Sequence, residues 1–185
     1  MLAALSSAIE ARDPYTRGHS ARVATLAEAV ARRLGWAESH LETLRVGGAL
    51  HDVGKLTLPA AVLSKPGPLT RDELRAIRTH PAAGARMIES IHSVRSARPY
   101  VLHHHERWDG RGYPHRLRGV AIPVEARLLA VADAYDAMTS TRPYRRALSE
   151  TDALLELESC AGCQFDPELA HAFIAVWSDG VAGPF

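Results

Sequence analysis

Histidine is frequent in this sequence, with ten among 185 residues. Several stand beside carboxylates: His51 precedes Asp52, and the histidine run 103–105 precedes Glu106. Asp133 interrupts an apolar segment, where an unpaired carboxylate would be costly to bury and a bound cation would remove that cost. Imidazole and carboxylate without thiolate form a donor set suited to iron, manganese, nickel or zinc. The pattern therefore predicts a metal site.

The candidate ligands outnumber the four that one tetrahedral ion takes. They are His19, His51, Asp52, His80, the run His103 to His105, and Asp133. A pair of ions clamps the attacking and the leaving oxygen of a phosphoryl group and supplies hydroxide at neutral pH. Any one of these histidines, taken alone, is more often a surface or hydrogen-bonded residue than a ligand. The set as a whole indicates phosphoester hydrolysis.

The elements that must position these residues are helices almost throughout. Apolar residues recur at helical spacing over 23–34, 41–52, 124–138 and 169–177. Thr70 and Glu73 form a capping-box signature before another helix. Proline and glycine mark loops over 58–69 and 108–123, and a short hairpin within the second stays open. The sequence predicts an all-α, single-domain helical bundle over residues 1–185.

The composition bears on which ligands the protein can bind and on where in the cell it is found. The net charge is +1, so no basic field favours duplex nucleic acid, and an anionic ligand would need a local cluster of cations. No apolar run is long enough for a membrane span, and the first residues lack the basic start of a signal peptide. Two cysteines make no disulfide framework, so we expect a cytoplasmic protein.

The order of these residues resembles the HD superfamily of metal-dependent phosphohydrolases, and the surrounding strings resemble its HD-GYP subfamily. The name-giving tripeptide is 112–114, Gly-Tyr-Pro. The strings that carry the resemblance are Asp13 to Ser20, His51 to Lys55, Lys65 to Gly67, His80-Pro81, His104 to Pro114, Asp133 to Ser140 and Arg142 to Arg145. The resemblance covers about Leu5 to Phe173, and it implies the all-α fold of that superfamily.

The resemblance implies two divalent metal ions, iron or manganese foremost and nickel or zinc as alternatives. The first would be held by His19, His51, Asp52 and Asp133. Asp52 would bridge to a second, held also by His80, His104 and His105. Some members have a glutamate four residues before the first histidine that helps to bind a third metal. Tyr15 stands there in this chain, so two ions are expected.

The resemblance also implies substrate contacts. Lys55 would contact the scissile phosphate, and Arg142 and Arg145 would bind the phosphates of the substrate, for which the arginine fork is well shaped. Tyr113 would shape the substrate loop. Asp136, one helical turn after Asp133, is interpreted as a support for the ligands rather than as the general acid, which the sequence does not identify.

The implied function is a cyclic di-GMP phosphodiesterase that uses a metal-bridging hydroxide. Its products would be the linear dinucleotide pGpG and, after a second cleavage, GMP. Two alternatives stay open: hydrolysis of another cyclic dinucleotide, and an interaction module that binds diguanylate cyclase (GGDEF) domains. The family usually couples this domain to a sensory or receiver domain, so such a partner is also expected, fused or separate.

The remaining candidates have simpler interpretations. Cys160 and Cys163 form a C-x-x-C at the predicted end of a helix, without the second pair of a zinc ribbon, and are taken as ordinary thiols. His103 falls outside the matched strings, because three consecutive histidines cannot all face one ion. The four other histidines are expected at the surface: His40, His92, His115 and His171.

Overall fold

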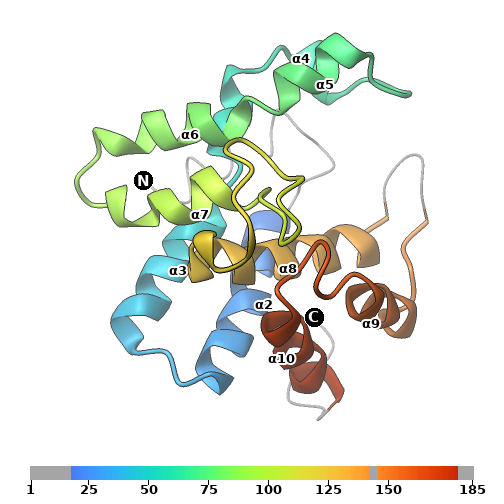
Figure 1. Ribbon diagram of the computed structural model, residues 1–185. Coiled ribbons are helices and arrows are strands. Elements are labelled where there is room, and N and C mark those ends of the chain that lie inside the picture. Colours follow the sequence, from blue (N-terminus) through green and yellow to red (C-terminus); the bar gives the residue numbers. More distant parts are fainter. Residues whose placement is uncertain (1–17, 142–145, 179–185) are drawn as a thin grey trace.

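The computed structural model describes residues 18–141 and 146–178 (Figure 1). Three residues with predicted roles, Tyr15, Arg142 and Arg145, lie outside that part of the chain. The elements in order are α2 (His19–Arg33), α3 (Glu38–Leu50), η2 (Val53–Thr57), α4 (Ala60–Leu63), α5 (Arg71–Ile77), α6 (His80–Glu89), η3 (Arg95–Ala97), α7 (Arg98–His103), η4 (Gly119–Ala121), α8 (Val124–Thr139), α9 (Glu150–Ser159) and α10 (Pro167–Ser178).

The prediction of an all-α fold is confirmed. The described residues form no strand, and the loop over 108–123 holds only the short turn η4 rather than a hairpin. The capping box is present, since Thr70 accepts from the Glu73 N–H at 3.2 Å and Glu73 accepts from the Thr70 N–H at 2.7 Å. Helix α2 ends before Gly35, whose positive φ of 75° favours glycine.

Two apolar clusters support the helices. The larger joins α2, α3, α8, α9 and α10, with Val23, Leu128 and Phe173 wholly buried. The smaller lies between α3, η2, α6 and α7 around Leu50 and Val53. His51 and Asp52 lie between Leu50 and Val53 in the chain, so the packing of the smaller cluster positions both of them.

Helices α4 and α5 lie outside this packed body. They form an arm at the opposite end of the view from α10 (Figure 1), and neither contains a buried residue. Among the described residues, none of the helices combines the length and apolar character needed to cross a bilayer.

Candidate metal centre

The structure brings the seven predicted ligands together in two adjoining groups. One ligand atom from each member of a group lies within 4.8 Å of those of the other members. The first group is His19, His51 and Asp133, and the second is Asp52, His80, His104 and His105. They come from α2, α8, the end of α3, the start of α6 and the end of α7.

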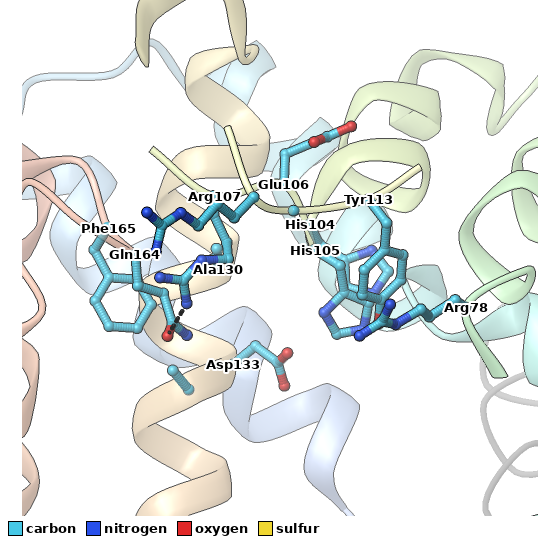
Figure 2. Close-up of a pocket in the computed structure, with 13 residues that line it drawn as sticks. Arg78, His104, His105, Glu106, Arg107, Tyr113, Ala130, Asp133, Gln164 and Phe165 are labelled. Atoms are coloured by element: carbon cyan, nitrogen blue, oxygen red, sulfur yellow. Dashed lines mark hydrogen bonds between the residues drawn. The ribbon is translucent and has the colours of Figure 1, made fainter. Parts of the chain in front are cut away.

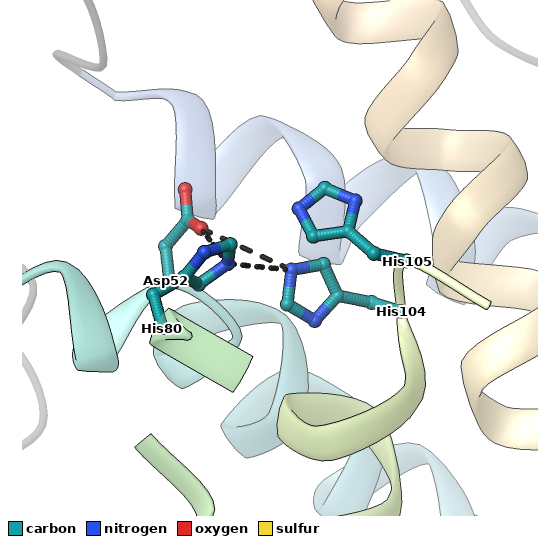
Figure 3. A group of neighbouring side chains, drawn as sticks. All are labelled: Asp52, His80, His104 and His105. Carbon is teal, nitrogen blue, oxygen red and sulfur yellow. Dashed lines mark hydrogen bonds and ion pairs between the residues drawn. The ribbon is translucent and has the colours of Figure 1, made fainter. Parts of the chain in front are cut away.

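Asp52 lies between the two groups (Figure 3). Its Oδ1 is 3.2 Å from His80 Nε2 and 3.9 Å from His104 Nε2. Its Oδ2 is 3.5 Å from His51 Nε2, which belongs to the first group. One carboxylate therefore faces imidazoles of both groups, the position that a bridging ligand must occupy.

Three of the imidazoles are anchored by the same local hydrogen bond. Each Nδ1 faces the carbonyl oxygen three residues earlier: His51 faces Gly48 at 2.7 Å, His80 faces Ile77 at 2.8 Å and His104 faces Val101 at 3.0 Å. A carbonyl only accepts, so each Nδ1 donates and each Nε2 keeps its lone pair. These nitrogens are thereby prepared to bind a cation.

His19 is held by side chains from α8 instead. Its Nδ1 lies 2.7 Å from Asp136 Oδ2, and its Nε2 lies 3.2 Å from Asp133 Oδ1. Arg22 supports Asp136 from the other side, with its Nε 2.5 Å from Oδ1. Asp136 thus orients His19 in the way that a carboxylate supports a metal-bound histidine. Sequence reasoning missed Arg22, although it stands one helical turn after His19.

Burial and neighbouring charges shift the pKa values of the groups in the site. Burial raises the pKa of Asp52, but the Lys55 ammonium and the nearby histidines outweigh burial and hold that pKa well below its ordinary value. Burial lowers the pKa of His104 well below its ordinary value and the pKa of His105 to about 4. Burial also lowers the pKa of His19, but hydrogen bonds to two aspartates outweigh it and raise that pKa to about 9.

The residues fit a pair of divalent cations. His51 Nε2 is buried and has no hydrogen-bond partner within the described part of the chain. A buried polar atom without a partner is costly, and a cation placed before it would remove the cost. The donors are imidazole and carboxylate, which suit first-row divalent metals. Which metal is bound remains a prediction.

A close backbone approach holds the second group. A Cβ on Gly54 would collide with the carbonyl oxygen of His80. Glycine at this position therefore lets η2 lie directly against the start of α6, which places His80 beside Asp52. A larger residue at position 54 would push the two ligands apart.

Lys55 lies at the centre, with its Nζ 2.7 Å from Asp52 Oδ2. Its side chain is 19% exposed, so the ammonium neutralises the buried carboxylate while part of the side chain keeps contact with solvent. The contact with Asp52 was not anticipated from the sequence. The predicted contact with the scissile phosphate stays a prediction.

A cavity of about 300 Å³ adjoins the two groups (Figure 2). His105 and Asp133 line it on the metal side. Tyr113 lines it too, with its ring centroid 4.8 Å from that of His105. The guanidinium group of Arg78 lies over this ring, 5.5 Å from its centroid. The volume matches the lower range of ligand pockets.

The far wall of the cavity holds a polar pair that sequence reasoning missed. Arg107 donates to Gln164 Oε1 at 2.7 Å (Figure 2), and it also pairs with Asp109 at 2.8 Å. The pair joins the loop after α7 to the turn before α10. Arg107 stands inside one of the quoted strings, whereas no local signal marks Gln164.

The remaining cysteines and histidines behave as expected. Cys160 and Cys163 are free thiols, and Cys160 caps the end of α9. The four histidines predicted at the surface are exposed: His40, His92, His115 and His171. His103 belongs to neither metal group.

Comparison with known proteins finds a matching family and several relatives. The profile of the HD domain matches residues 3–169. The cyclic di-GMP phosphodiesterase response regulator RpfG of Xanthomonas campestris is 40% identical over 175 residues, which are 94% of this chain and 46% of that protein. The 3'3'-cGAMP-specific phosphodiesterase 2 of Vibrio cholerae is 34% identical over 180 residues, 96% of this chain and 34% of that protein. The chain thus spans less than half of either relative.

Solved structures show the same fold. The cyclic GMP-AMP-specific phosphodiesterase V-cGAP3 of Vibrio cholerae superposes with a TM-score of 0.72 at 19% identity. The superposition covers 96% of this chain and 48% of that one. This likeness confirms the helical architecture that positions the two groups.

Proposed function

The chain belongs to the HD domain family, in its HD-GYP branch, and on that premise we propose that it is a metal-dependent phosphodiesterase that hydrolyses cyclic di-GMP. The observation that carries the proposal is the position of Asp52 between two groups of imidazole and carboxylate ligands. The name of RpfG supports the substrate, since that relative is called a cyclic di-GMP phosphodiesterase.

Two divalent cations would be held by the two groups, with Asp52 shared between them. Such a pair supplies Lewis-acid stabilisation and activates water at neutral pH. The protein contributes rigid donors, because three of the imidazoles are fixed by backbone carbonyls. Rigid donors reduce the reorganisation that binding and reaction require.

The substrate would lie in the cavity beside the centre. Its walls carry Arg78, Arg107 and Tyr113, which offer two guanidinium groups and an aromatic ring to a phosphate and a purine. Lys55 would add an ammonium at the edge of the centre. Arg142 and Arg145 remain proposed phosphate contacts. The proposed products are pGpG and, after a second cleavage, GMP.

A second substrate has specific support. The relative from Vibrio cholerae is named as specific for 3'3'-cGAMP, so that cyclic dinucleotide is the second candidate substrate. Several expectations stay predictions: the choice of iron or manganese, the single domain over 1–185, a GGDEF-domain partner and a coupled sensory or receiver domain.

Product analysis tests the proposal. Purified protein, loaded with iron or manganese without oxygen, should convert cyclic di-GMP to pGpG faster than it converts 3'3'-cGAMP or cyclic di-AMP. His104→Ala should remove the activity and His92→Ala, an exposed control, should not. Faster turnover of 3'3'-cGAMP would replace the substrate, and no turnover of any of the three would overturn the proposal.

Lys55→Ala separates two roles for the ammonium. If Lys55 contacts phosphate, turnover should fall about ten- to a hundredfold at full metal content, since a hydrogen bond to a charged group contributes about 1.5–3 kcal/mol. Loss of metal in this variant would show instead that the ammonium serves to hold Asp52.

A further inference from the structure

A third group of ligand side chains lies apart from the two described above. His103, Glu106 and His115 each offer one ligand atom within 4.8 Å of the other two. His103 is the last residue of α7, whereas the next residue, His104, directs its Nε2 to Asp52. His103 and His104 therefore serve different groups, and no predicted role used His103, Glu106 or His115.

The carboxyl group of Glu106 is buried. The side chain has 0% exposure. It accepts from the N–H of His115 at 2.7 Å and from the N–H of Leu117 at 3.0 Å. Within the described residues it pairs with no arginine or lysine. Buried charges in proteins are paired or bind metals, so two backbone hydrogen bonds leave this carboxylate only partly compensated.

His103 and His115 lie beside this carboxyl group. His103 Nδ1 is buried without a hydrogen-bond partner in the described part of the chain, and it lies 4.0 Å from Glu106 Oε1. The ring of His115 is 5.4 Å from that of His103. His115 is exposed, so an ion could enter from solvent on its side.

We propose that His103, Glu106 and His115 bind a further divalent cation, with zinc as the best match. Zinc bonds to nitrogen and carboxylate oxygen are about 2.0–2.2 Å long, so two ligand atoms of a tetrahedral ion lie about 3.4 Å apart. His103 Nδ1 and Glu106 Oε1 are 4.0 Å apart, so the two side chains would approach each other by about 0.6 Å when the ion binds. Two histidines and a glutamate leave the fourth position of zinc to water.

The ion would join the end of α7 to the loop that follows it. His103 precedes the ligand pair His104 and His105, and His115 follows Tyr113 by two residues. An ion bound here would hold the helix end against the loop and so steady the cavity wall. The role is structural, and it adds no group to the reacting centre.

Zinc stoichiometry of the intact protein tests the site. The wild type and His115→Ala would be stripped with chelator and titrated with zinc alone. His115→Ala should bind one equivalent fewer, or bind its last equivalent at least about tenfold more weakly, since even outer-shell losses cost 10- to 100-fold in affinity. His92→Ala, an equally exposed histidine, should match the wild type.

The difference between variants isolates this site from the proposed catalytic pair. The number of equivalents that His115→Ala retains reports on the catalytic pair, whereas the equivalent that it loses relative to the wild type reports on the site at His115. Cobalt gives a second readout, because a tetrahedral site should add visible absorption that His115→Ala and His103→Gln both lose. Equal stoichiometry, affinity and cobalt spectra in folded His115→Ala and wild type would show that only water fills the group.

Discussion

The histidines of the two metal groups are anchored in two different ways. In the second group, His80 and His104 are anchored by carbonyls three residues earlier, as is His51 in the first. His19 is anchored by Asp136, which stands 117 residues away in the chain. The one kind of anchor is local backbone, and the other is a charged side chain from another helix.

This difference sets the proton state of the metal-free protein. Burial lowers the pKa of His104 and of His51, so both are neutral near pH 7. Burial lowers the pKa of His19 as well, but two aspartates raise it to about 9, so it carries a proton at pH 7. A cation must displace that proton. A histidine anchored by a carbonyl is therefore already neutral and can bind a cation. His19, which is anchored by a carboxylate, keeps a positive charge until a metal ion replaces its proton.

The largest effect should come from replacing Asp52, which lies between the two metal groups. Asp52→Ala removes the carboxylate that faces imidazoles of both groups. We expect metal content to fall at both groups and hydrolysis to drop more than a thousandfold, beyond the 10²–10³ typical of one lost transition-state donor. Metal analysis and turnover measure this. Full metal content with normal turnover would refute the shared position.

The stability of the metal-free protein should depend on pH because His19 is protonated. The folded pKa of His19, about 9, lies above the unfolded value of 6.5. Its contribution is therefore complete below pH 6.5 and is lost as the pH rises through 9. A shift of this size corresponds to roughly 3 kcal/mol. Urea unfolding between pH 6 and 10 measures it, and His19→Gln should show a flatter profile.

Asp136→Asn should affect only the group with the carboxylate anchor. The amide keeps the size of the side chain but loses the charge that orients His19. We expect metal affinity of the first group to fall about 10- to 100-fold, as outer-partner losses usually do, with the second group unchanged. Metal titration measures both.

Ser140→Ala is the matched control for that change. Ser140 Oγ lies 3.4 Å from the same carboxylate. At this length the contact is weak, so this variant should alter the affinity by less than about threefold. An equal loss of affinity in both groups of Asp136→Asn would show that the two kinds of anchor are not independent.

The smallest effect should come from the ring that packs on His105. Tyr113→Leu keeps an apolar contact but removes the aromatic pair, whose ring centroids are 4.8 Å apart. Aromatic pairs contribute about 0.5–1.5 kcal/mol, so turnover should fall about two- to tenfold at full metal content. A loss of one metal in this variant would give the ring a larger part in holding His105.

The sequence alone predicted the helical fold, and its resemblance to a known family predicted the seven ligands as a set. The hydrogen bonds that orient three of them follow from the local chain around each histidine. Helix geometry brings residue i to the carbonyl of residue i−3, so a histidine at a helix end finds its anchor without help from the rest of the chain. The capping box at Thr70 and the end of α2 before Gly35 are local in the same sense.

Only the tertiary structure decided how the groups relate to one another. The packing of α2 on α8 brought Asp136 to His19 and supported it with Arg22. The folding of the loop after α7 brought Glu106 and His115 to His103, the last residue of that helix. These contacts join residues far apart in the chain or on a loop without periodicity, and no spacing rule encodes them, because they depend on how whole helices bury their apolar faces.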